Sequence, residues 1–147
     1  MLTFDEFGHL IADQPIESDL AEVEAVFVFN EKRRLIFADL LAFLEELTAM
    51  GIGDFQVWID GSFVTKKVNP KDMDCVFFLN YQVFDKNESR LRQIRNDYKL
   101  AIDSYFIPIF PENHPHFNHY NLDRVDWLFL FSRDRQRRKK GFLQLEF

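Results

Sequence analysis

The chain has 147 residues, of which 47% are hydrophobic and 29% charged, and its formal net charge is -6. This length and composition predict one globular domain with a substantial core, and they exclude a disordered chain. An acidic chain is also a poor general DNA-binding protein, because nucleic-acid affinity comes largely from neutralised phosphates.

The first half of the chain predicts a helix between less regular segments. Residues 1–29 predict mostly irregular structure, with at most a short strand or helix. Asn30 is a suitable N-cap, and apolar residues then recur at helical spacing up to about Thr48, before Gly51. Residues 55–60 alternate in polarity and predict a strand that Gly61 ends.

The second half predicts alternating strands and helices. After a turn at Pro70, we expect a strand over 72–79, a helix over 87–98 and a strand over 100–110. A loop is expected over 114–121, a short helix or strand over 122–131, and a last strand over 141–147. This order predicts an α/β (α+β) fold in a single domain over 1–147, with its core at about 31–110 and a C-terminal helix and strand at 121–147.

Charge and cysteine content bear on the cellular setting. Residues 1–31 hold eight acidic side chains and no Lys or Arg, whereas residues 133–140 are mostly basic, as in a solvated turn or a segment that holds a nucleotide or an RNA end. The single cysteine, Cys75, rules out an internal disulfide and favours a reducing compartment. Without a signal-peptide pattern or an apolar run of ~18 residues, we expect a cytoplasmic protein that does not enter membranes.

Three acidic residues indicate a metal site. Asp72 and Asp74 lie two positions apart on a predicted strand, so they face the same side with Cα atoms about 6.6 Å apart. Two such carboxylates repel each other unless a cation or a proton lies between them. Asp103 lies in an otherwise apolar strand, where a metal would compensate its charge. We therefore predict that Asp72, Asp74 and Asp103 hold Mg²⁺ or Mn²⁺.

The turn at Gly61 and Ser62 predicts a phosphate site. A strand that turns sharply after a glycine presents backbone N–H groups, and a helix or nest that begins there attracts phosphate. Gly61 allows close approach of a ligand, and the hydroxyl of Ser62 adds a donor. We expect a triphosphate above the carboxylates, with a metal between the two.

These residues carry a family resemblance. Ile59-Asp60-Gly61-Ser62, a gap of nine residues and then Asp72-Met73-Asp74-Cys75-Val76 resemble the signature of the DNA polymerase beta-like nucleotidyltransferase superfamily, and Asp103 matches its third carboxylate. The similarity covers about residues 54–107 and is closest to small stand-alone bacterial and phage-borne members. It implies a mixed sheet packed against helices.

The resemblance also implies an activity and partners. A nucleoside monophosphate would pass from an NTP, with ATP expected, to a hydroxyl of a protein or RNA acceptor, and pyrophosphate would leave. Asp72 and Asp74 would bind both metals, Asp103 would bind the catalytic metal and help to activate the acceptor, and Gly61 and Ser62 would hold the β- and γ-phosphates. A toxin–antitoxin setting, with a toxin-like protein partner, is a further implication.

The chain departs from this pattern after Ser62. Many small members continue with Ala-Arg-Gly, whereas Phe63-Val64-Thr65-Lys66 stands here, and Lys66 or Lys67 would have to supply the missing charge. The residue before Gly61 is Asp60, which places another acid near the site. The alternative function is therefore a catalytically inactive module on the same fold that binds a nucleotide or a protein partner. A third hypothesis is a protein-interaction domain that uses the acidic first 31 residues.

Other readings concern histidines and a tryptophan. His114, His116 and His119 fall within six residues, but no cysteine or acid at a usual spacing completes a zinc site, so exposed loop histidines are expected. Trp127 could stack on a base, although an aromatic residue in an apolar segment is more typical of a core. Cys75 is expected to be buried and inert.

Overall fold

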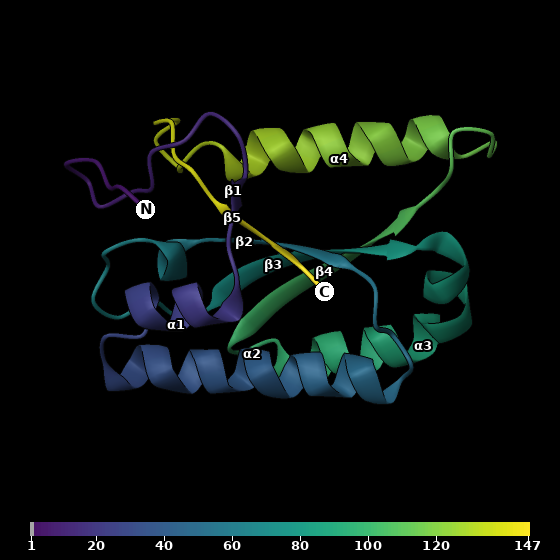
Figure 1. The fold of residues 1–147 in the computed structure, drawn as a ribbon, viewed down its shortest axis with the longest axis horizontal. Helices are drawn as coiled ribbons and strands as arrows, with labels where there is room; N and C mark the ends of the chain where they lie inside the picture. The colour runs from purple at the N-terminus through teal and green to yellow at the C-terminus, as the bar shows by residue number, and fades with distance from the viewer. Residues whose placement is uncertain (1) are drawn as a thin grey trace.

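A five-stranded sheet forms the middle layer of the protein and is covered by helices on both faces (Figure 1). The structure is a computed structural model, and it describes residues 2–147. The strand order is β1-β5-β2-β3-β4, with bounds β1 (Ile16–Glu17), β2 (Gln56–Asp60), β3 (Met73–Asn80), β4 (Ile102–Ile109) and β5 (Leu143–Glu146).

The sheet is mixed. β3 pairs antiparallel to β2 and parallel to β4, while β5 pairs antiparallel to β2 and parallel to β1. The expected α+β fold, with a mixed sheet packed against helices, is therefore confirmed.

Helices cover the two faces of the sheet unequally. α1 (Leu20–Phe27), α2 (Glu31–Ala49) and α3 (Tyr81–Tyr98) lie on one face, and α4 (Phe117–Phe131) lies alone on the other (Figure 1). The larger core joins the first three helices to residues such as Val57 and Phe77. A smaller core, built on Trp58 and Phe78, joins the sheet to α4. No helix of residues 2–147 is long and apolar enough to cross a membrane.

Local capping explains where several helices begin. The side chain of Asn30 accepts a hydrogen bond from the N–H of Arg33, which confirms the predicted N-cap of α2. Asp19 caps α1 in the same way, so the region predicted as mostly irregular holds both a short strand and a helix. The side chain of Asn80 caps α3, which therefore starts directly after β3 and six residues earlier than predicted.

The predicted loop over 114–121 is partly wrong. α4 begins at Phe117, so most of that segment, residues 117–121, is helical, and residues 122–131 continue the helix rather than form a strand. The N-cap residue of this helix is His116, and no side-chain hydrogen bond caps the helix there. The local sequence therefore lacks the capping residue that marks the start of a helix. Pro108 lies inside β4, which is possible because β4 is the edge strand and has one side free of partners.

Candidate functional site

Three aspartates on adjacent strands form a row across the sheet. Asp60 on β2 is the Cα partner of Asp74 on β3, and Asp74 is the partner of Asp103 on β4. Directly paired residues point to the same face, and neighbouring strands lie about 4.8 Å apart. We call Asp60, Asp74 and Asp103 the acid row. It lies on the face that α4 covers, because Trp58, two residues before Asp60, packs in the core beneath that helix.

Asp72 adds a fourth acid beside this row. It precedes β3 by one residue and is half-buried. Its charge is one of three that raise the pKa of Asp74, together with those of Asp60 and Asp103. Asp72 and Asp103 therefore both lie close enough to Asp74 to act on it electrostatically.

The pKa of Asp74 is raised to about 7, first by burial and then by the neighbouring acids. Lys140 opposes this shift but does not cancel it. A carboxyl group with a pKa of this size exchanges its proton readily near neutral pH, and a bound cation would displace that proton.

Gly61 brings the backbone close to the carboxylate of Asp74. Its φ is 83°, and a Cβ atom built there would lie 2.6 Å from Asp74 Oδ2. Both the left-handed conformation and the close approach therefore favour glycine at this position. The turn continues into the 3₁₀ helix η1 (Ser62–Val64), so the predicted turn after Gly61 is present.

A buried guanidinium holds the segment that follows this turn. Arg33 is fully buried, and it donates hydrogen bonds from α2 to five backbone carbonyl groups, which belong to Phe27, Ser62, Phe63, Thr65 and Lys67. No carboxylate lies among these partners, and burial lowers the pKa of Arg33 to about 10. The shape of residues 62–67 thus depends on one side chain from another element.

A large cavity brings the predicted residues together. Its volume is about 1350 Å³, and its wall contains every site residue predicted from the sequence: Gly61, Ser62, Lys66, Lys67, Asp72, Asp74 and Asp103. Lys71, Arg133, Arg135 and Lys140 bring further positive charge to the same wall. We call this space the acid-row cavity. It combines closely spaced carboxylates with a surrounding group of cations, which suits an anionic ligand that brings its own metal.

Lys140 is the principal residue that sequence reasoning missed. Its ammonium group forms a buried ion pair with Asp60, 80 residues away in sequence. Burial raises the pKa of Asp60 to about 6, and the charge of Lys140 opposes that shift. The basic run 133–140 signalled a cation near a nucleotide, but nothing in the sequence assigned Lys140 to Asp60.

The predicted lysines have different surroundings. The Nζ atom of Lys66 lies 4.2 Å from the centre of the Phe4 ring, and its backbone N–H donates to the carbonyl of Gly8. Lys67 is exposed, and its carbonyl is held by Arg33. Both lysines line the acid-row cavity. A side chain that replaces the arginine of the Ala-Arg-Gly stretch would have to lie there.

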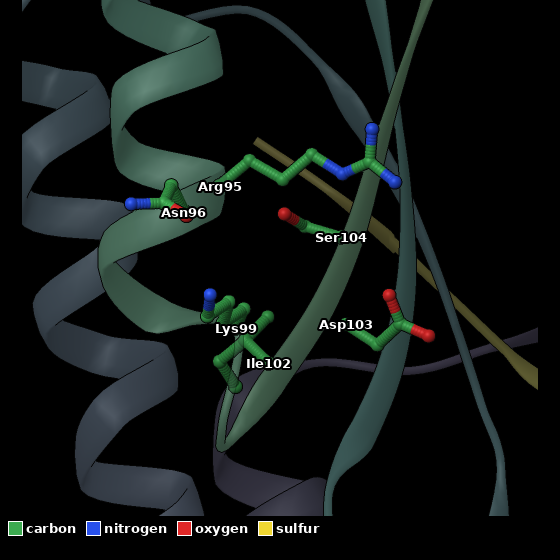
Figure 2. Close-up of a pocket in the computed structure, with 6 residues that line it drawn as sticks. All are labelled: Arg95, Asn96, Lys99, Ile102, Asp103 and Ser104. Atoms are coloured by element: carbon green, nitrogen blue, oxygen red, sulfur yellow. The ribbon is translucent and has the colours of Figure 1, made fainter.

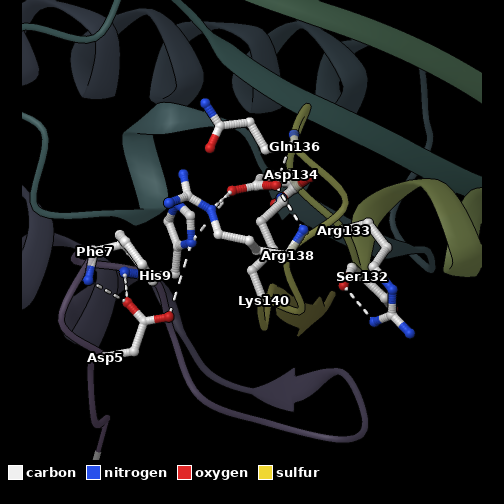
Figure 3. Close-up of polar contacts among 10 residues, drawn as sticks. Asp5, Phe7, His9, Ser132, Arg133, Asp134, Gln136, Arg138 and Lys140 are labelled. Atoms are coloured by element: carbon white, nitrogen blue, oxygen red, sulfur yellow. Dashed lines mark hydrogen bonds and ion pairs between the residues drawn. The ribbon is translucent and has the colours of Figure 1, made fainter.

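Residues 5–9 and part of the segment 133–140 line the acid-row cavity. Figure 3 shows the polar contacts that join these two segments. His9 Nδ1 lies 3.9 Å from a carboxylate oxygen of Asp5 and 3.9 Å from one of Asp134, and Arg138 binds Asp134 at 2.7 Å. His9 also bridges to Thr65 through the backbone. These contacts tie residues 5–9 and 134–138 to the turn after β2.

The donor chemistry of the site fits a hard divalent cation. The acid row supplies three carboxylates, the ligand type that Mg²⁺ and Mn²⁺ prefer, at paired positions on adjacent strands. Among residues 2–147, however, no group of three or more His, Cys, Asp or Glu side chains is gathered as a finished metal site. A metal at Asp72, Asp74 and Asp103 would therefore share its coordination with substrate phosphates and water.

The other residues singled out in the sequence, His114, Trp127 and Cys75, pack against side chains of the protein. The ring of His114 packs against Tyr81 and Phe110. Trp127 is half-buried and packs against Tyr105, with ring centres 4.7 Å apart, and it also lines the acid-row cavity. Cys75 is fully buried, as expected, and burial raises the pKa of its thiol.

Comparison with known proteins identifies a family. The sequence profile described as "Family of unknown function (DUF6932)" matches residues 2–146. No curated protein and no solved structure matches the chain significantly.

Proposed function

Because this chain belongs to the DUF6932 family, over nearly its whole length, we propose a function from the site itself: the protein is a metal-dependent nucleotidyltransferase. It would move a nucleoside monophosphate from an NTP, with ATP the first candidate, to a hydroxyl group of a protein or RNA acceptor. One observation carries the proposal. The Gly61-Ser62 turn and the acids Asp72, Asp74 and Asp103 line the same cavity.

The arrangement of strands supports the resemblance to the DNA polymerase beta-like superfamily. The strand before the Gly-Ser turn pairs antiparallel with the strand that carries Asp74, and a helix then leads to a parallel strand that carries Asp103. The resemblance requires the third carboxylate beside the first two. The register of Asp74 with Asp103 meets this requirement.

Each group has a chemical task in the proposed reaction. The cations Lys66, Lys67 and Lys71 would attract the triphosphate, and the close backbone at Gly61 would let it approach Asp74. Bound Mg²⁺ or Mn²⁺, held by Asp72, Asp74 and Asp103, would neutralise charge between carboxylates and phosphates. The acceptor oxygen forms a bond to the α-phosphorus, its proton passes to Asp103, and the bond between the α-phosphorus and the bridging oxygen breaks as pyrophosphate leaves.

Label transfer tests the proposal. The protein is incubated with each α-³²P-labelled NTP, Mg²⁺ or Mn²⁺, and cell extract, and labelled protein and RNA are separated. We expect transfer that Asp74→Asn and Asp103→Asn reduce on the order of 100-fold or more. Asp85→Asn is the matched control, because Asp85 is an exposed acid on α3. Absence of any label transfer dependent on Asp74 would contradict the proposed activity.

A second candidate function is supported by the ion pair of Lys140 with Asp60. A lysine ammonium that already neutralises part of the acid row is compatible with a module that binds a nucleotide and does not turn it over. Equilibrium dialysis for NTP binding and an assay for pyrophosphate release together separate the two functions. Tight NTP binding without release of pyrophosphate supports the inactive module, whereas metal-dependent pyrophosphate release excludes it. The toxin-like partner stays a prediction from the resemblance.

A further inference from the structure

Helix α4 carries apolar side chains on both of its sides. The inner side packs on the smaller core through four residues: Tyr120, Trp127, Leu128 and Phe131. The outer side exposes four further large apolar residues, each 58–71% exposed: Leu122, Val125, Phe129 and Leu130. A helix that is apolar all round is normally buried on all sides. No other helix of residues 2–147 covers the outer side of α4, which lies alone on its face of the sheet (Figure 1).

The exposed side of α3 is different. Every exposed residue of that helix is polar or charged, and Figure 2 shows two of them, Arg95 and Asn96, extending from its C-terminal end. The four exposed side chains of α4, at roughly 100 Å² each, instead present about 400 Å² of apolar surface. An apolar patch of that size on a soluble protein marks a contact with another molecule.

Two charged residues flank this patch in an order that matches a second copy of the same chain. Asp126 and Arg133 lie seven residues apart, about two helical turns, with Phe129 and Leu130 midway between them. Both are exposed, and neither forms an ion pair with any residue in the range 2–147. About a two-fold axis, a residue before the midpoint meets its counterpart after it. With the axis between Phe129 and Leu130, Asp126 of each copy therefore meets Arg133 of the other.

We propose that the outer side of α4 is the interface of a homodimer, in which the α4 helices of two copies pack antiparallel with Phe129 and Leu130 at the centre. The surface around this centre carries one exposed acid and one exposed base, so two chains of net charge -6 meet there without like charges face to face. A partner of different sequence would not require Asp126 and Arg133 to lie at equal distances from the apolar centre. The dimer does not depend on the proposed nucleotidyltransferase function.

The size of the patch sets the strength of the dimer. α4 has 15 residues and is about 22 Å long, and about 400 Å² of apolar surface per copy is half of the ~800 Å² that a standard interface buries on each partner. We therefore expect a reversible dimer with a dissociation constant on the order of 10–100 µM. Leu130 and Arg133 also line the acid-row cavity, so the interface borders that cavity.

Sedimentation equilibrium of the full chain, from about 1 to 300 µM, measures dimerisation directly. We expect wild type to dimerise and Phe129→Ser to weaken the dimer by at least about 10-fold, because Phe129 is 71% exposed and lies at the proposed centre. Leu35→Ser is the matched control: Leu35 is 51% exposed on α2, which covers the other face of the sheet, and its variant should dimerise like wild type. Circular dichroism should show both variants folded, since each side chain is at least half exposed.

Reversal of the two charges tests the antiparallel arrangement. Asp126→Arg places an arginine opposite Arg133 of the other copy, and Arg133→Asp places an aspartate opposite Asp126, twice in each dimer because of the symmetry. Either change should weaken dimerisation about 10-fold at low salt and less at high salt. The double variant Asp126→Arg/Arg133→Asp restores both pairs with their signs exchanged, so its dissociation constant should return to within about 3-fold of wild type.

Three results would overturn the proposal. A wild-type chain that stays monomeric over the whole concentration range assigns the outer side of α4 to a partner other than a second copy. A dimer that Phe129→Ser leaves unchanged has its interface elsewhere on the molecule. A double charge variant that dimerises as weakly as the single variants contradicts the pairing of Asp126 with Arg133. Nucleotide transfer enters none of these measurements, so failure of the proposed function leaves their meaning unchanged.

Discussion

Arg33 and Arg34 are neighbours in sequence with opposite surroundings. Arg33 is fully buried and donates only to backbone carbonyls, whereas Arg34 is exposed and pairs with Glu31 on the helix surface. Removal of Arg33 leaves several buried carbonyls without donors, and each such group costs about 1–3 kcal/mol. An exposed pair contributes about 0.5 kcal/mol or less.

We therefore expect Arg33→Met to lower the free energy of unfolding by at least about 3 kcal/mol and Arg34→Met by less than about 0.5 kcal/mol. Urea unfolding followed by circular dichroism measures both. Because Arg33 holds residues 62–67, its variant should also bind NTP more weakly than its stability alone explains. Equal unfolding midpoints for the two variants would contradict this role of Arg33.

Asp74 makes stability depend on pH. Its pKa is raised from 3.8 to about 7 in the folded protein, so folding favours the neutral form. The resulting stabilisation is complete below pH ~4 and is lost as the pH rises to about 7. Asp74→Asn should therefore match wild type at pH 4 and be more stable at pH 8, by about 1–3 kcal/mol because the carboxylate is partly exposed.

Thermal melts at pH 4 and pH 8, with and without MgCl₂, measure this effect. A cation bound at the acids stabilises the folded state by mass action, so Mg²⁺ should raise the melting temperature of wild type at pH 8 and that of Asp74→Asn much less. Asp85→Asn serves again as control and should follow wild type throughout. A variant Asp74→Asn no more stable than wild type at pH 8 would show that the acid row carries no such repulsion.

The turn between β2 and η1 and the end of α2 each contain a glycine in the left-handed conformation. Gly51 and Gly61 share a φ of 83°, but of these two only Gly61 would place an added Cβ atom within 4 Å of a neighbour, the closest being Asp74 Oδ2. Alanine costs about 1 kcal/mol at either position because of the backbone conformation. Gly61→Ala should also displace the carboxylate of Asp74, which sits at the end of a side chain and can move.

The two alanine variants should therefore differ little in stability and greatly in function. We expect Gly51→Ala to retain label transfer and metal-dependent stabilisation, and Gly61→Ala to lose both while its unfolding free energy stays within about 1 kcal/mol of that of Gly51→Ala. Melting curves with Mg²⁺ and the transfer assay together decide. Full Mg²⁺ stabilisation in Gly61→Ala would show that the close approach is not needed.

The same elements show what the sequence can predict. Helix α2 was predicted closely because Asn30 caps it and its apolar residues repeat at helical spacing. The charge of Asp103 in an apolar strand predicts a shared site with Asp74, and the two residues are Cα partners on the neighbouring strands β3 and β4. The start of α4 was not predictable, because no capping side chain marks it.

Contacts between distant segments account for most of what was missed. Local periodicity predicts elements, but it does not determine which loops meet above the sheet. His9 lies between Asp5 and Asp134, and Arg33 reaches five carbonyls, through tertiary contacts that no spacing motif announces. The ion pair of Lys140 with Asp60 belongs to the same class.

The acid-row cavity forms only where distant parts of the chain meet. Its wall takes residues 5–9, the turn after β2, the end of α4 and the basic segment 133–140. Backbone hydrogen bonds join these parts: Gly141 donates to Leu10 at 2.6 Å, and Lys66 donates to Gly8 at 3.0 Å. The site therefore depends on the docking of both outer segments onto the sheet, and its formation is coupled to global folding.

Lys139 and Lys140 allow this coupling to be measured. Lys139 forms an exposed ion pair with Asp13, while Lys140 forms a buried one with Asp60. Removal of one partner of a buried pair costs about 3–5 kcal/mol, because the other charge is left without compensation. Lys140→Met should therefore destabilise the protein by about that amount at pH 8, and Lys139→Met by less than about 1 kcal/mol.

A double-mutant cycle identifies the cause. The pKa of Asp60, about 6 in the presence of Lys140, should rise further in Lys140→Met, so the loss of stability should shrink when the pH is lowered to 5 and Asp60 is protonated. For the same reason, Asp60→Asn/Lys140→Met should recover most of the stability lost at pH 8. Failure of the double variant to recover would mean that Lys140 stabilises the docked C-terminal segment by packing, independently of the charge on Asp60.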